Sequence, residues 1–311
     1  MNAGIVDIAT ETPGEHVPNS YFDEIGLTDE WIHRRTGVGA RWWMDDAESL
    51  DDVAARVCAP LVARHGGRLA ISALIVVSSS AGGAVPGIAQ GVAKKAGLPS
   101  EVLAFDMSAA CSGFVYGLIS GLSLCESSGS GVIVCCVEAM SRMLDKTDRN
   151  TGPLFGDGAG AVLLEPRPSF RKHRWHAGCD GDGADLMRGQ IGKGIALDGI
   201  RVYHRAVRTM TETAKLLRDN DIEPTIVIGH QANSRILQRV RDEADIGSAV
   251  FVDRVENFGN TSAASIPLAL GASLADGSIP TSGRALLVAY GAGEAWGGVM
   301  VDYDLADTPH G

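Results

Sequence analysis

The sequence predicts an α/β protein whose mostly parallel strands are covered by helices. Short runs rich in Val, Ile, Leu and Ala alternate with longer segments whose apolar residues recur at helical spacing, and this alternation is typical of parallel sheets. The strand runs are apolar at nearly every position, as expected when helices cover both faces of a sheet. With 311 residues, the chain is long enough for two domains or one large α/β unit.

In the first half of the chain, strands and helices are predicted to alternate up to a glycine-rich turn. Residues 11–20 are predicted to form a loop, because Pro13 and Pro18 interrupt them. Each predicted helix ends at or just before a glycine, which is a usual helix stop signal. The predicted helices cover residues 29–37, 50–65 and 87–96, and the predicted strands lie within residues 4–9, 74–77, 102–107, 131–137 and 154–164.

The second half is predicted to begin with an irregular connection at residues 166–201, which is richer in glycine and charge and includes a lid. Residues 74–82 resemble residues 286–293 in pattern, and this hints at an internal duplication. The predicted helices cover residues 202–217, 234–244 and 261–274, and the predicted strands cover residues 225–228, 249–252, 285–289 and 298–302.

Composition narrows the functional class. The net charge is −11 and there is no long basic run, so nucleic acid is not an expected partner. The six cysteines show neither metal-ligand spacing nor a disulfide framework, which favours a reducing compartment and no metal. Residues 1–10 lack the features of a signal peptide, and no apolar stretch reaches the roughly 18 residues of a membrane span. We therefore expect a cytoplasmic protein that uses no membrane.

Cys111 is a candidate nucleophile at the point where a predicted strand turns into a helix. Residues 102–107 read as a buried strand, and Phe114, Leu118 and Leu122 then recur at helical spacing. Unpaired N–H groups and the macrodipole at a helix N-terminus stabilise a thiolate, the nucleophilic form of cysteine. The alternative is a small buried hydrophobic residue, as many free cysteines are.

Two further polar residues are predicted to lie near strand ends. His230 follows the strand at residues 225–228, and ligands of open α/β sheets bind at that edge. Most single histidines are structural, so packing alone is the alternative. Asn260 lies in the segment 257–265, where it can also cap the following helix.

Cys, His and Asn together suit one kind of acyl chemistry. A thiolate attacks an acyl thioester and becomes acylated. A His and an Asn side chain then donate hydrogen bonds to a carbonyl oxygen and stabilise the enolate that forms when a neighbouring carboxylate leaves as CO2. No strong base is needed, because decarboxylation itself generates the carbanion.

The whole chain resembles the thiolase-fold condensing enzymes of the β-ketoacyl-ACP synthase III family. The matching stretches follow the family's order and span nearly all of the chain. They are Thr28-Asp29-Glu30-Trp31-Ile32, Arg35-Thr36-Gly37, Asp106-Met107-Ser108-Ala109-Ala110-Cys111-Ser112-Gly113-Phe114, Phe155-Gly156-Asp157-Gly158-Ala159-Gly160-Ala161, His230-Gln231-Ala232-Asn233 and Gly259-Asn260-Thr261-Ser262-Ala263-Ala264-Ser265.

The resemblance implies a thiolase-like α/β fold with a duplicated, five-layer α-β-α-β-α core, and a homodimer. The N-terminal half, residues 1–166, would carry the nucleophile, and residues 167–311 would carry the catalytic His and Asn. Cys111, His230 and Asn260 would be the catalytic triad. The main-chain N–H groups of Cys111 and Ala292 would form the oxyanion hole.

The resemblance also implies binding residues. The expected coenzyme A and pantetheine contacts are Trp31, Arg35, Arg149 and Asn233, and the expected docking residues for an acyl carrier protein are Arg235 and Arg239. An indole and a guanidinium can enclose adenine, and arginine neutralises phosphate. Acyl-CoA and malonyl-CoA or malonyl-ACP would be substrates, and no cofactor would be bound permanently.

The chain departs from the family near the expected acyl pocket, which Val85, Tyr290 and Glu294 are predicted to line. Val85 and the run 78–84 are smaller than usual, which favours an acyl group larger than acetyl. Tyr290 stands where the family usually has Phe, which keeps the pockets dry. Glu294 replaces an apolar residue, and it would act as a base, bind a polar substrate, or be a solvated turn residue. The lid between residues 166 and 200 is shorter than usual.

The preferred function is an acyltransferase that joins an acyl thioester to a malonyl-type thioester by decarboxylative Claisen condensation, in fatty acid synthesis or in a polyketide, quinolone or pyrone pathway. A second possibility is acyl transfer to an alcohol or amine without decarboxylation, for which Glu294 would be the base. A papain-like hydrolase, which shares the Cys, His, Asn order, and an inactive binding partner are less favoured functions.

Overall fold

A ten-stranded mixed sheet runs through the computed structural model, which describes residues 1–83, 85–218 and 223–308. One half of the sheet has the strand order β5-β4-β6-β7-β1, and the other has the order β12-β11-β13-β14, with β8 beside β14. The halves join where β1 and β14 pair in parallel. The strands are β1 (Asn2–Glu11), β4 (Ile71–Val77), β5 (Leu103–Met107), β6 (Gly131–Glu138), β7 (Gly158–Arg167), β8 (Arg174–Cys179), β11 (Ile226–Gly229), β12 (Val250–Val252), β13 (Ser282–Tyr290) and β14 (Ala295–Asp304).

The two halves repeat one pattern of strand pairing. In the first half, β4 pairs in parallel with β5 and β6, and antiparallel pairing continues from β6 to β7 and from β7 to β1. In the second half, β11, β12, β13, β14 and β8 repeat this pattern. The duplication is therefore present, but the segments whose pattern suggests it are not equivalent. Residues 74–82 belong to β4 and its loop, whereas residues 286–293 belong to β13, the counterpart of β6, and the turn after it.

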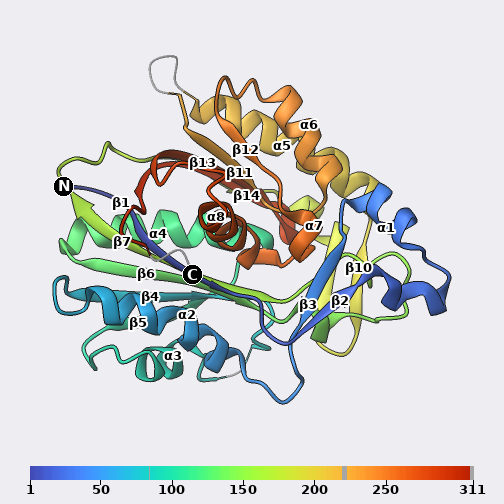
Figure 1. Cartoon of the computed structure of the whole chain (residues 1–311), viewed down its shortest axis with the longest axis horizontal. Coiled ribbons are helices and arrows are strands. Elements are labelled where there is room, and N and C mark those ends of the chain that lie inside the picture. Colours follow the sequence, from blue (N-terminus) through green and yellow to red (C-terminus); the bar gives the residue numbers. More distant parts are fainter. Residues whose placement is uncertain (84, 219–222, 309–311) are drawn as a thin grey trace.

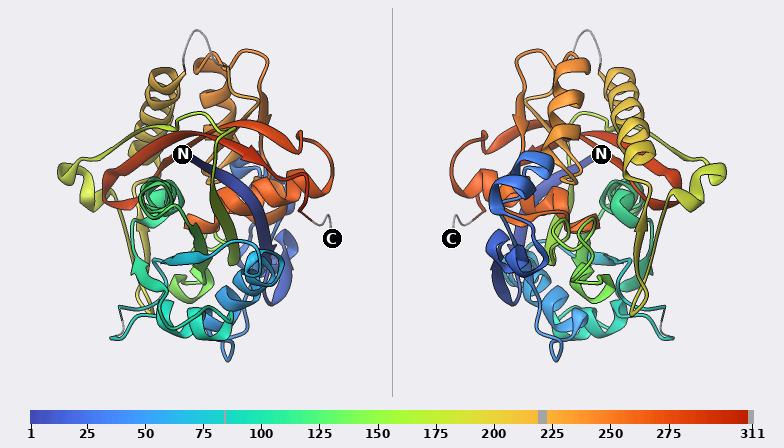
Figure 2. Two further views of the ribbon diagram at one scale, coloured as in Figure 1. Left: turned by 90° about the vertical axis from the view of Figure 1, so that its left-hand side faces the viewer. Right: turned by 90° about the vertical axis from the view of Figure 1, so that its right-hand side faces the viewer.

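The helices complete a five-layer arrangement (Figure 1, Figure 2). Helices α2 and α3 cover the outer face of the first half, α5 and α6 cover the outer face of the second, and α4 and α8 lie between the halves, in contact with strands of both. This central layer contains the largest apolar core, which includes Phe114, Leu118 and Leu268. The helices are α2 (Leu50–His65), α3 (Ala89–Lys95), α4 (Gly113–Ser128), α5 (Gly199–Leu217), α6 (Ser234–Glu243) and α8 (Ser265–Ala275).

Side-chain caps begin several of these helices where the sequence offers them. Ser49 accepts a hydrogen bond from the N–H of Asp52 at the start of α2, and Thr28 caps the start of α1 (Asp29–Thr36) in the same way. Asp198 and Asn233 cap α5 and α6. These caps satisfy N–H groups that the first helical turn leaves free. No helix within the described residues is both long and apolar enough to cross a bilayer.

Three sequence predictions differ from the structure. The predicted loop at residues 11–20 contains β2 (Glu15–Pro18), which pairs with β3 (Ala40–Trp43). The predicted irregular connection contains β8 and a hairpin of β9 (Met187–Gln190) and β10 (Gly194–Leu197). Most side chains of these strands are not buried, so the strands lack the apolar run that marks the buried strands in the sequence. The strand β5 is an edge strand and not a buried one, and Leu103 is 53% exposed.

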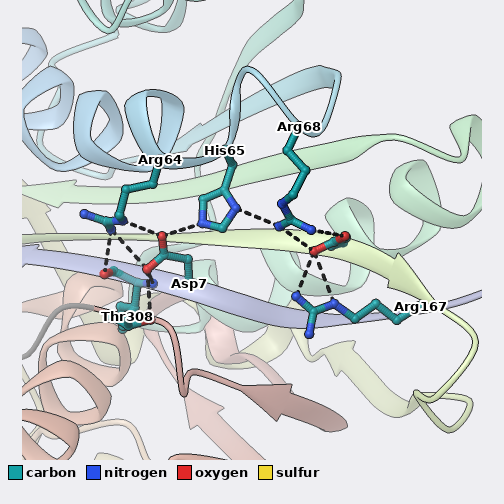
Figure 3. A network of polar contacts seen from close by, with 8 residues as sticks. Asp7, Arg64, His65, Arg68, Arg167 and Thr308 are labelled. Carbon is teal, nitrogen blue, oxygen red and sulfur yellow. Dashed lines mark hydrogen bonds and ion pairs between the residues drawn. The ribbon is translucent and has the colours of Figure 1, made fainter.

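A polar network ties β1, α2 and the C-terminal segment together (Figure 3). Asp7, on β1, is only 1% exposed. Its carboxylate accepts hydrogen bonds from Arg64 at 2.7 Å and from the Thr308 hydroxyl at 2.9 Å. Arg68 donates to Nδ1 of His65 at 2.9 Å, so the His65 proton lies on Nε2, which is 2.7 Å from Asp7. The network therefore depends on the charge of Asp7.

Asp7→Ala is expected to lower the free energy of unfolding by about 3 kcal/mol, because it leaves a guanidinium and an imidazole without their buried partner. Urea unfolding of the purified variant measures this effect. Asp304→Ala is the matched control, since Asp304 is 41% exposed in its ion pair with Arg167, and such pairs contribute about 1 kcal/mol or less. Equal losses in the two variants would show that the Asp7 network adds no stability.

Candidate active site

Cys111, His230 and Asn260 line one cavity of about 720 Å³. Cys111 precedes α4 and Asn260 lies shortly before α8, which are equivalent helices in the two halves, and His230 directly follows β11. The duplicated fold therefore brings these three residues together from distant parts of the sequence. Asn260 differs from the sequence prediction in one respect, because it follows the short helix α7 (Val255–Phe258) and not a strand.

Cys111 is held in a turn that the end of β13 packs against. Residues Ala110–Ser112 form a 3₁₀ turn before α4, and Ala110 has a positive φ of 46°. A Cβ atom added to Gly291 would lie 2.9 Å from the main-chain nitrogen of Cys111. Only glycine allows this approach, and it brings the segment that follows β13 against the nucleophile.

Two main-chain N–H groups face the sulfur of Cys111. They belong to Cys111 itself and to Ala292, and both form hydrogen bonds that lower the pKa of the thiol. Burial is the larger effect and raises the pKa of Cys111 to about 12. The helix N-terminus alone, on which the sequence argument relies, therefore does not hold a thiolate at neutral pH. The geometry instead suits an oxyanion that forms beside the sulfur.

His230 is a buried, neutral hydrogen-bond donor. Burial lowers its pKa to about 4. Its Nδ1 atom lies 2.7 Å from the hydroxyl of Ser265, and that oxygen already accepts a hydrogen bond from the N–H of Gln231. The Ser265 proton is then directed to Nδ1, and we assign the His230 proton to Nε2.

Asn260 is oriented by its own neighbours. Its Oδ1 atom accepts a hydrogen bond from the N–H of Ser262 at 2.9 Å, which leaves Nδ2 as the group it can offer to the cavity. Its main chain bridges to the glycine-rich turn before β7, because its N–H donates to Leu154 and its carbonyl accepts from Gly156. This bridge gives the glycine-rich motif at residues 155–161 a role in positioning Asn260.

Backbone strain is concentrated at this site. Within the described residues, four residues other than glycine have positive φ: Ala110, Ser262, Glu294 and Asp245. Ala110 precedes Cys111, Ser262 holds Asn260, and Glu294 lies two residues after Ala292. Such conformations cost about 1–3 kcal/mol each and persist where the surrounding structure requires them.

The predicted coenzyme A contacts lie together along the cavity. Arg35 stacks on Trp31, with its guanidinium carbon 4.9 Å from the ring centroid. Arg149 and Arg235 line the same cavity, so three exposed guanidinium groups converge on it. The Asn233 side chain caps α6 and donates to the carbonyl of Arg35, which fixes its place beside His230.

Arg239, the second predicted docking residue, does not line the cavity. It lies on the exposed side of α6, where its guanidinium pairs with Glu243 at 2.5 Å. Arg241 is likewise close to Asp242. These pairs neutralise the outer part of α6, so the positive charge near the cavity comes from Arg235 and not from Arg239.

Val85 does not line this cavity, so its place in the acyl pocket stays a prediction. Val85 is 97% exposed and is not among the residues that line the cavity. Val85 belongs to the loop that follows β4, and Ala84, the residue before it, lies outside the described residues. The expectation of an acyl group larger than acetyl likewise stays a prediction. The apolar lining of the cavity includes Phe155, Met187 and Leu197.

Tyr290 lines the cavity as predicted, but Glu294 does not. Glu294 is 3% exposed, pairs with Arg205, and accepts a hydrogen bond from the Tyr290 hydroxyl at 2.8 Å. It lines a second hollow of about 410 Å³ on the other side of Tyr290. Glu294 is therefore neither a base in the cavity nor a solvated turn residue. Its carboxylate pairs with Arg205 on α5, which is too distant in the sequence for a local pattern to predict.

Ser262 and Ser265, which position Asn260 and His230, are not among the residues predicted from the sequence. Ser265 sets the tautomer of His230 and Ser262 orients Asn260. Both lie inside the motif at residues 259–265, so their position is visible in the sequence although their roles are not. Met187 and Leu197 come from the hairpin β9–β10, which lies in the predicted irregular connection and contributes these two residues to the cavity lining.

Sequence comparison with known families agrees with this geometry. The family model described as 3-oxoacyl-[acyl-carrier-protein] synthase III matches residues 105–181, and the model of its C-terminal part matches residues 214–303. The chain is 35% identical to a β-ketoacyl-[acyl-carrier-protein] synthase III from Halalkalibacterium halodurans, over 96% of this chain and 98% of that one.

Solved structures show the same likeness. A 3-oxoacyl-(acyl carrier protein) synthase III from Pseudomonas aeruginosa superposes with a TM-score of 0.89 at 32% identity, over 98% of this chain and 99% of that one. The priming β-ketosynthase of a polyketide biosynthetic pathway superposes with a TM-score of 0.88 at 27% identity, over 97% and 96% of the two chains.

Proposed function

Because the chain belongs to the β-ketoacyl-[acyl-carrier-protein] synthase III family, we propose that it transfers an acyl group from a thioester to Cys111 and condenses it with a malonyl-type thioester, with loss of CO2. The observation that carries this proposal is the convergence of Cys111, His230 and Asn260 on one cavity. The surroundings of Cys111 and His230 support the proposal. The thiol lies beside two N–H groups, and the imidazole is neutral.

The decarboxylation step is assigned to His230 and Asn260. Loss of CO2 from a malonyl thioester leaves an enolate, and Nε2–H and Nδ2 donate hydrogen bonds to its oxygen. The low pKa of His230 suits this role, since a neutral imidazole donates without transferring its proton to the carbanion. The enolate carbon then attacks the acyl group on Cys111, and the sulfur leaves.

Acyl transfer to an alcohol or amine, the second function that the sequence allows, loses its distinguishing feature. That reaction needs a base to deprotonate the acceptor. Glu294 is the candidate in the sequence, but it faces away from the cavity and is paired with Arg205. A specialised polyketide, quinolone or pyrone pathway stays a prediction, and neither of the departures at Val85 and Glu294 lines the cavity.

We assign the substrate carrier to coenzyme A and acyl carrier protein thioesters. The cavity of about 720 Å³ runs from Cys111 to Trp31, Arg35 and Arg149. An indole and a guanidinium in stacked contact offer flat surfaces for adenine, and the arginines match phosphate. Arg235 is the docking contact that an acidic carrier protein would meet beside the cavity, whereas Glu243 weakens Arg239 in this role.

We also infer a homodimer that pairs through β5. This edge strand presents unpaired main-chain groups and an exposed Leu103, and the nearby Val85 is exposed as well. Edges of this kind invite pairing with a second strand. Sedimentation of the purified chain at micromolar concentration tests the inference, and a monomer throughout would contradict it.

Intact-protein mass after incubation with a panel of acyl-CoAs tests the proposed reaction. A mass increase equal to the acyl group, followed by its discharge and the release of CO2 when malonyl-CoA or malonyl-ACP is added, would support condensation. Discharge without CO2 would instead indicate simple transfer. Failure of all coenzyme A and carrier-protein donors to label the protein would overturn the proposal.

Trp31→Ala is expected to raise the KM for acyl-CoA about tenfold and to leave kcat nearly unchanged, because stacking on a base contributes about 1–3 kcal/mol and is made equally in the ground and transition states. Steady-state kinetics with acyl-CoA measures the split. Arg239→Ala is the control, since its guanidinium is paired with Glu243 away from the cavity. Equal KM values for Trp31→Ala and wild type would remove the adenine assignment.

A further inference from the structure

A fully buried carboxylate lies behind Cys111 and has no role in the reaction described so far. Glu138 ends β6 and has no exposed surface. It accepts hydrogen bonds from the main-chain N–H groups of Ser79 and Ser80 at 3.1 Å, and from both of their hydroxyls at 2.7 Å. This is a dense set of donors for one carboxylate, all from the segment that follows β4.

Ser262 connects this carboxylate to the nucleophile. A hydrogen bond from its hydroxyl lowers the pKa of Glu138 on one side and the pKa of Cys111 on the other. The Ser79 hydroxyl lies 3.4 Å from the same oxygen. Ser262 is held in its conformation, with a positive φ of 50°, by the hydrogen bond from its N–H to Asn260. A path therefore leads from Sγ of Cys111 through the hydroxyl of Ser262 to Glu138, and the Ser79 hydroxyl, which donates to Glu138 at 2.7 Å, connects Ser262 to the same carboxylate.

We propose that Glu138 accepts the proton of the Cys111 thiol through the hydroxyl of Ser262 when the thiol attacks an acyl thioester. The inference rests on the proposed function for its substrate, but the proton path itself is a property of the free enzyme. Ser262 touches the reacting sulfur, and Glu138 acts through it.

The proton balance closes over both half-reactions. In the first, the thiol proton moves to Oγ of Ser262 while the Ser262 proton moves to Glu138, the S–C bond forms, and the donor thiolate leaves and takes a proton from solvent. In the second, the new C–C bond expels the sulfur of Cys111 as a thiolate. The proton held by Glu138 then returns to that sulfur by the same path, and no oxidant or other reactant is needed.

The surroundings of both groups fit this exchange. Burial raises the pKa of Glu138 above its ordinary value, so the carboxylate is a better proton acceptor than an exposed one. Burial also raises the pKa of Cys111 to about 12, so the thiol needs an acceptor at neutral pH. The groups that face the pair are the Ser78–Ser80 segment, Ser262, the thiol of Cys136, and His230 and Asn260 across the cavity.

Glu138→Gln separates proton acceptance from a purely electrostatic effect, because the two predict opposite changes in the reaction rate of Cys111. The negative charge of Glu138 raises the pKa of Cys111. If charge were its only effect, the variant would react faster at neutral pH. If Glu138 accepts the proton, the variant reacts more slowly, by about 10²-fold, as is usual when a general base is removed.

The experiment follows alkylation of Cys111 by iodoacetamide between pH 5 and 10, in a Cys179→Ser background because Cys179 is the exposed cysteine among those described. We expect the wild-type rate to fall as pH drops through the pKa of Glu138 and to change little above it. We expect the rate of Glu138→Gln to rise about tenfold per pH unit instead, because only hydroxide then removes the proton. A Glu138→Gln rate at pH 7 equal to or above wild type would overturn the proposal.

Two further variants provide a control and a second test of the proton path. Glu165→Gln changes another poorly exposed carboxylate, which pairs with Arg68 and Arg167 outside the cavity, and should leave alkylation unchanged. Ser262→Ala breaks the path while it keeps Glu138, and is expected to match the slow Glu138→Gln profile. It also serves if Glu138→Gln does not fold, and a wild-type profile for Ser262→Ala would equally overturn the proposal. Because alkylation needs no acyl substrate, its result can be interpreted even if the condensation assay fails.

Discussion

Cys111→Ala is expected to lose every trace of acyl-enzyme and to slow condensation by about 10⁴-fold or more, the scale on which removal of a covalent nucleophile acts. Cys111 is the cysteine that lines the cavity with His230 and Asn260, and the N–H groups of Cys111 and Ala292 point at its sulfur. Without that sulfur, no acyl-enzyme forms that could react with the malonyl thioester. Intact-protein mass after acyl-CoA treatment and product formation with malonyl-ACP measure the two losses.

The same variant makes a second, contrasting measurement possible. Decarboxylation of a malonyl thioester requires only donors for the enolate oxygen, and those are on His230 and Asn260. Cys111→Ala should therefore still release CO2 from malonyl-CoA, although no C–C bond forms. Cys125→Ala is a matched control, because Cys125 is fully buried within α4 and outside the cavity. An acylated Cys111→Ala protein would place the nucleophile elsewhere.

The contrast between Cys111 and Glu294 explains how far the sequence argument reaches. The position of Cys111 follows from local order, since a strand, a tight turn and a helix adjoin in sequence and the fold keeps them adjoining. Glu294 is expected near the site for the same reason, because it is close in sequence to Ala292. Its side chain, however, turns to Arg205 on α5, 89 residues away, and no local pattern carries that pairing.

Val85 and β5 show a related limit. An apolar run such as residues 102–107 predicts a strand, but not whether it lies at the centre or at the edge of a sheet. That distinction depends on which strands pair, and β5 pairs only with β4 among the described strands. Similarly, composition predicts a small-residue loop after β4 but not its direction, which leaves Val85 exposed. The duplicated topology is predictable through the resemblance, whereas the partners of single side chains are not.

Asn260→Ala is expected to reduce condensation by about 10²–10³-fold, the usual cost of removing one donor from an oxyanion site. The amide is fixed by the N–H of Ser262, and its Nδ2 is the donor directed to the cavity that Cys111 and His230 share. In the proposed mechanism, acylation of Cys111 instead uses the N–H groups of Cys111 and Ala292, which hydrogen-bond its sulfur. The acyl-enzyme should therefore form at nearly the wild-type rate and then persist.

Measuring the two steps separately tests whether the two oxyanion sites have separate roles. Mass spectrometry follows acyl loading, and CO2 release from malonyl-CoA follows the second step, each in Asn260→Ala and in His230→Ala. Asn257→Ala is the matched control, since Asn257 is exposed on α7 only three residues earlier. The double variant should be little slower than either single one, because one enolate oxygen receives both hydrogen bonds and the residues act as a unit. If Asn260→Ala slowed acylation as much as decarboxylation, the two steps would share one oxyanion site, and the assignment of Ala292 and Asn260 to separate sites would be wrong.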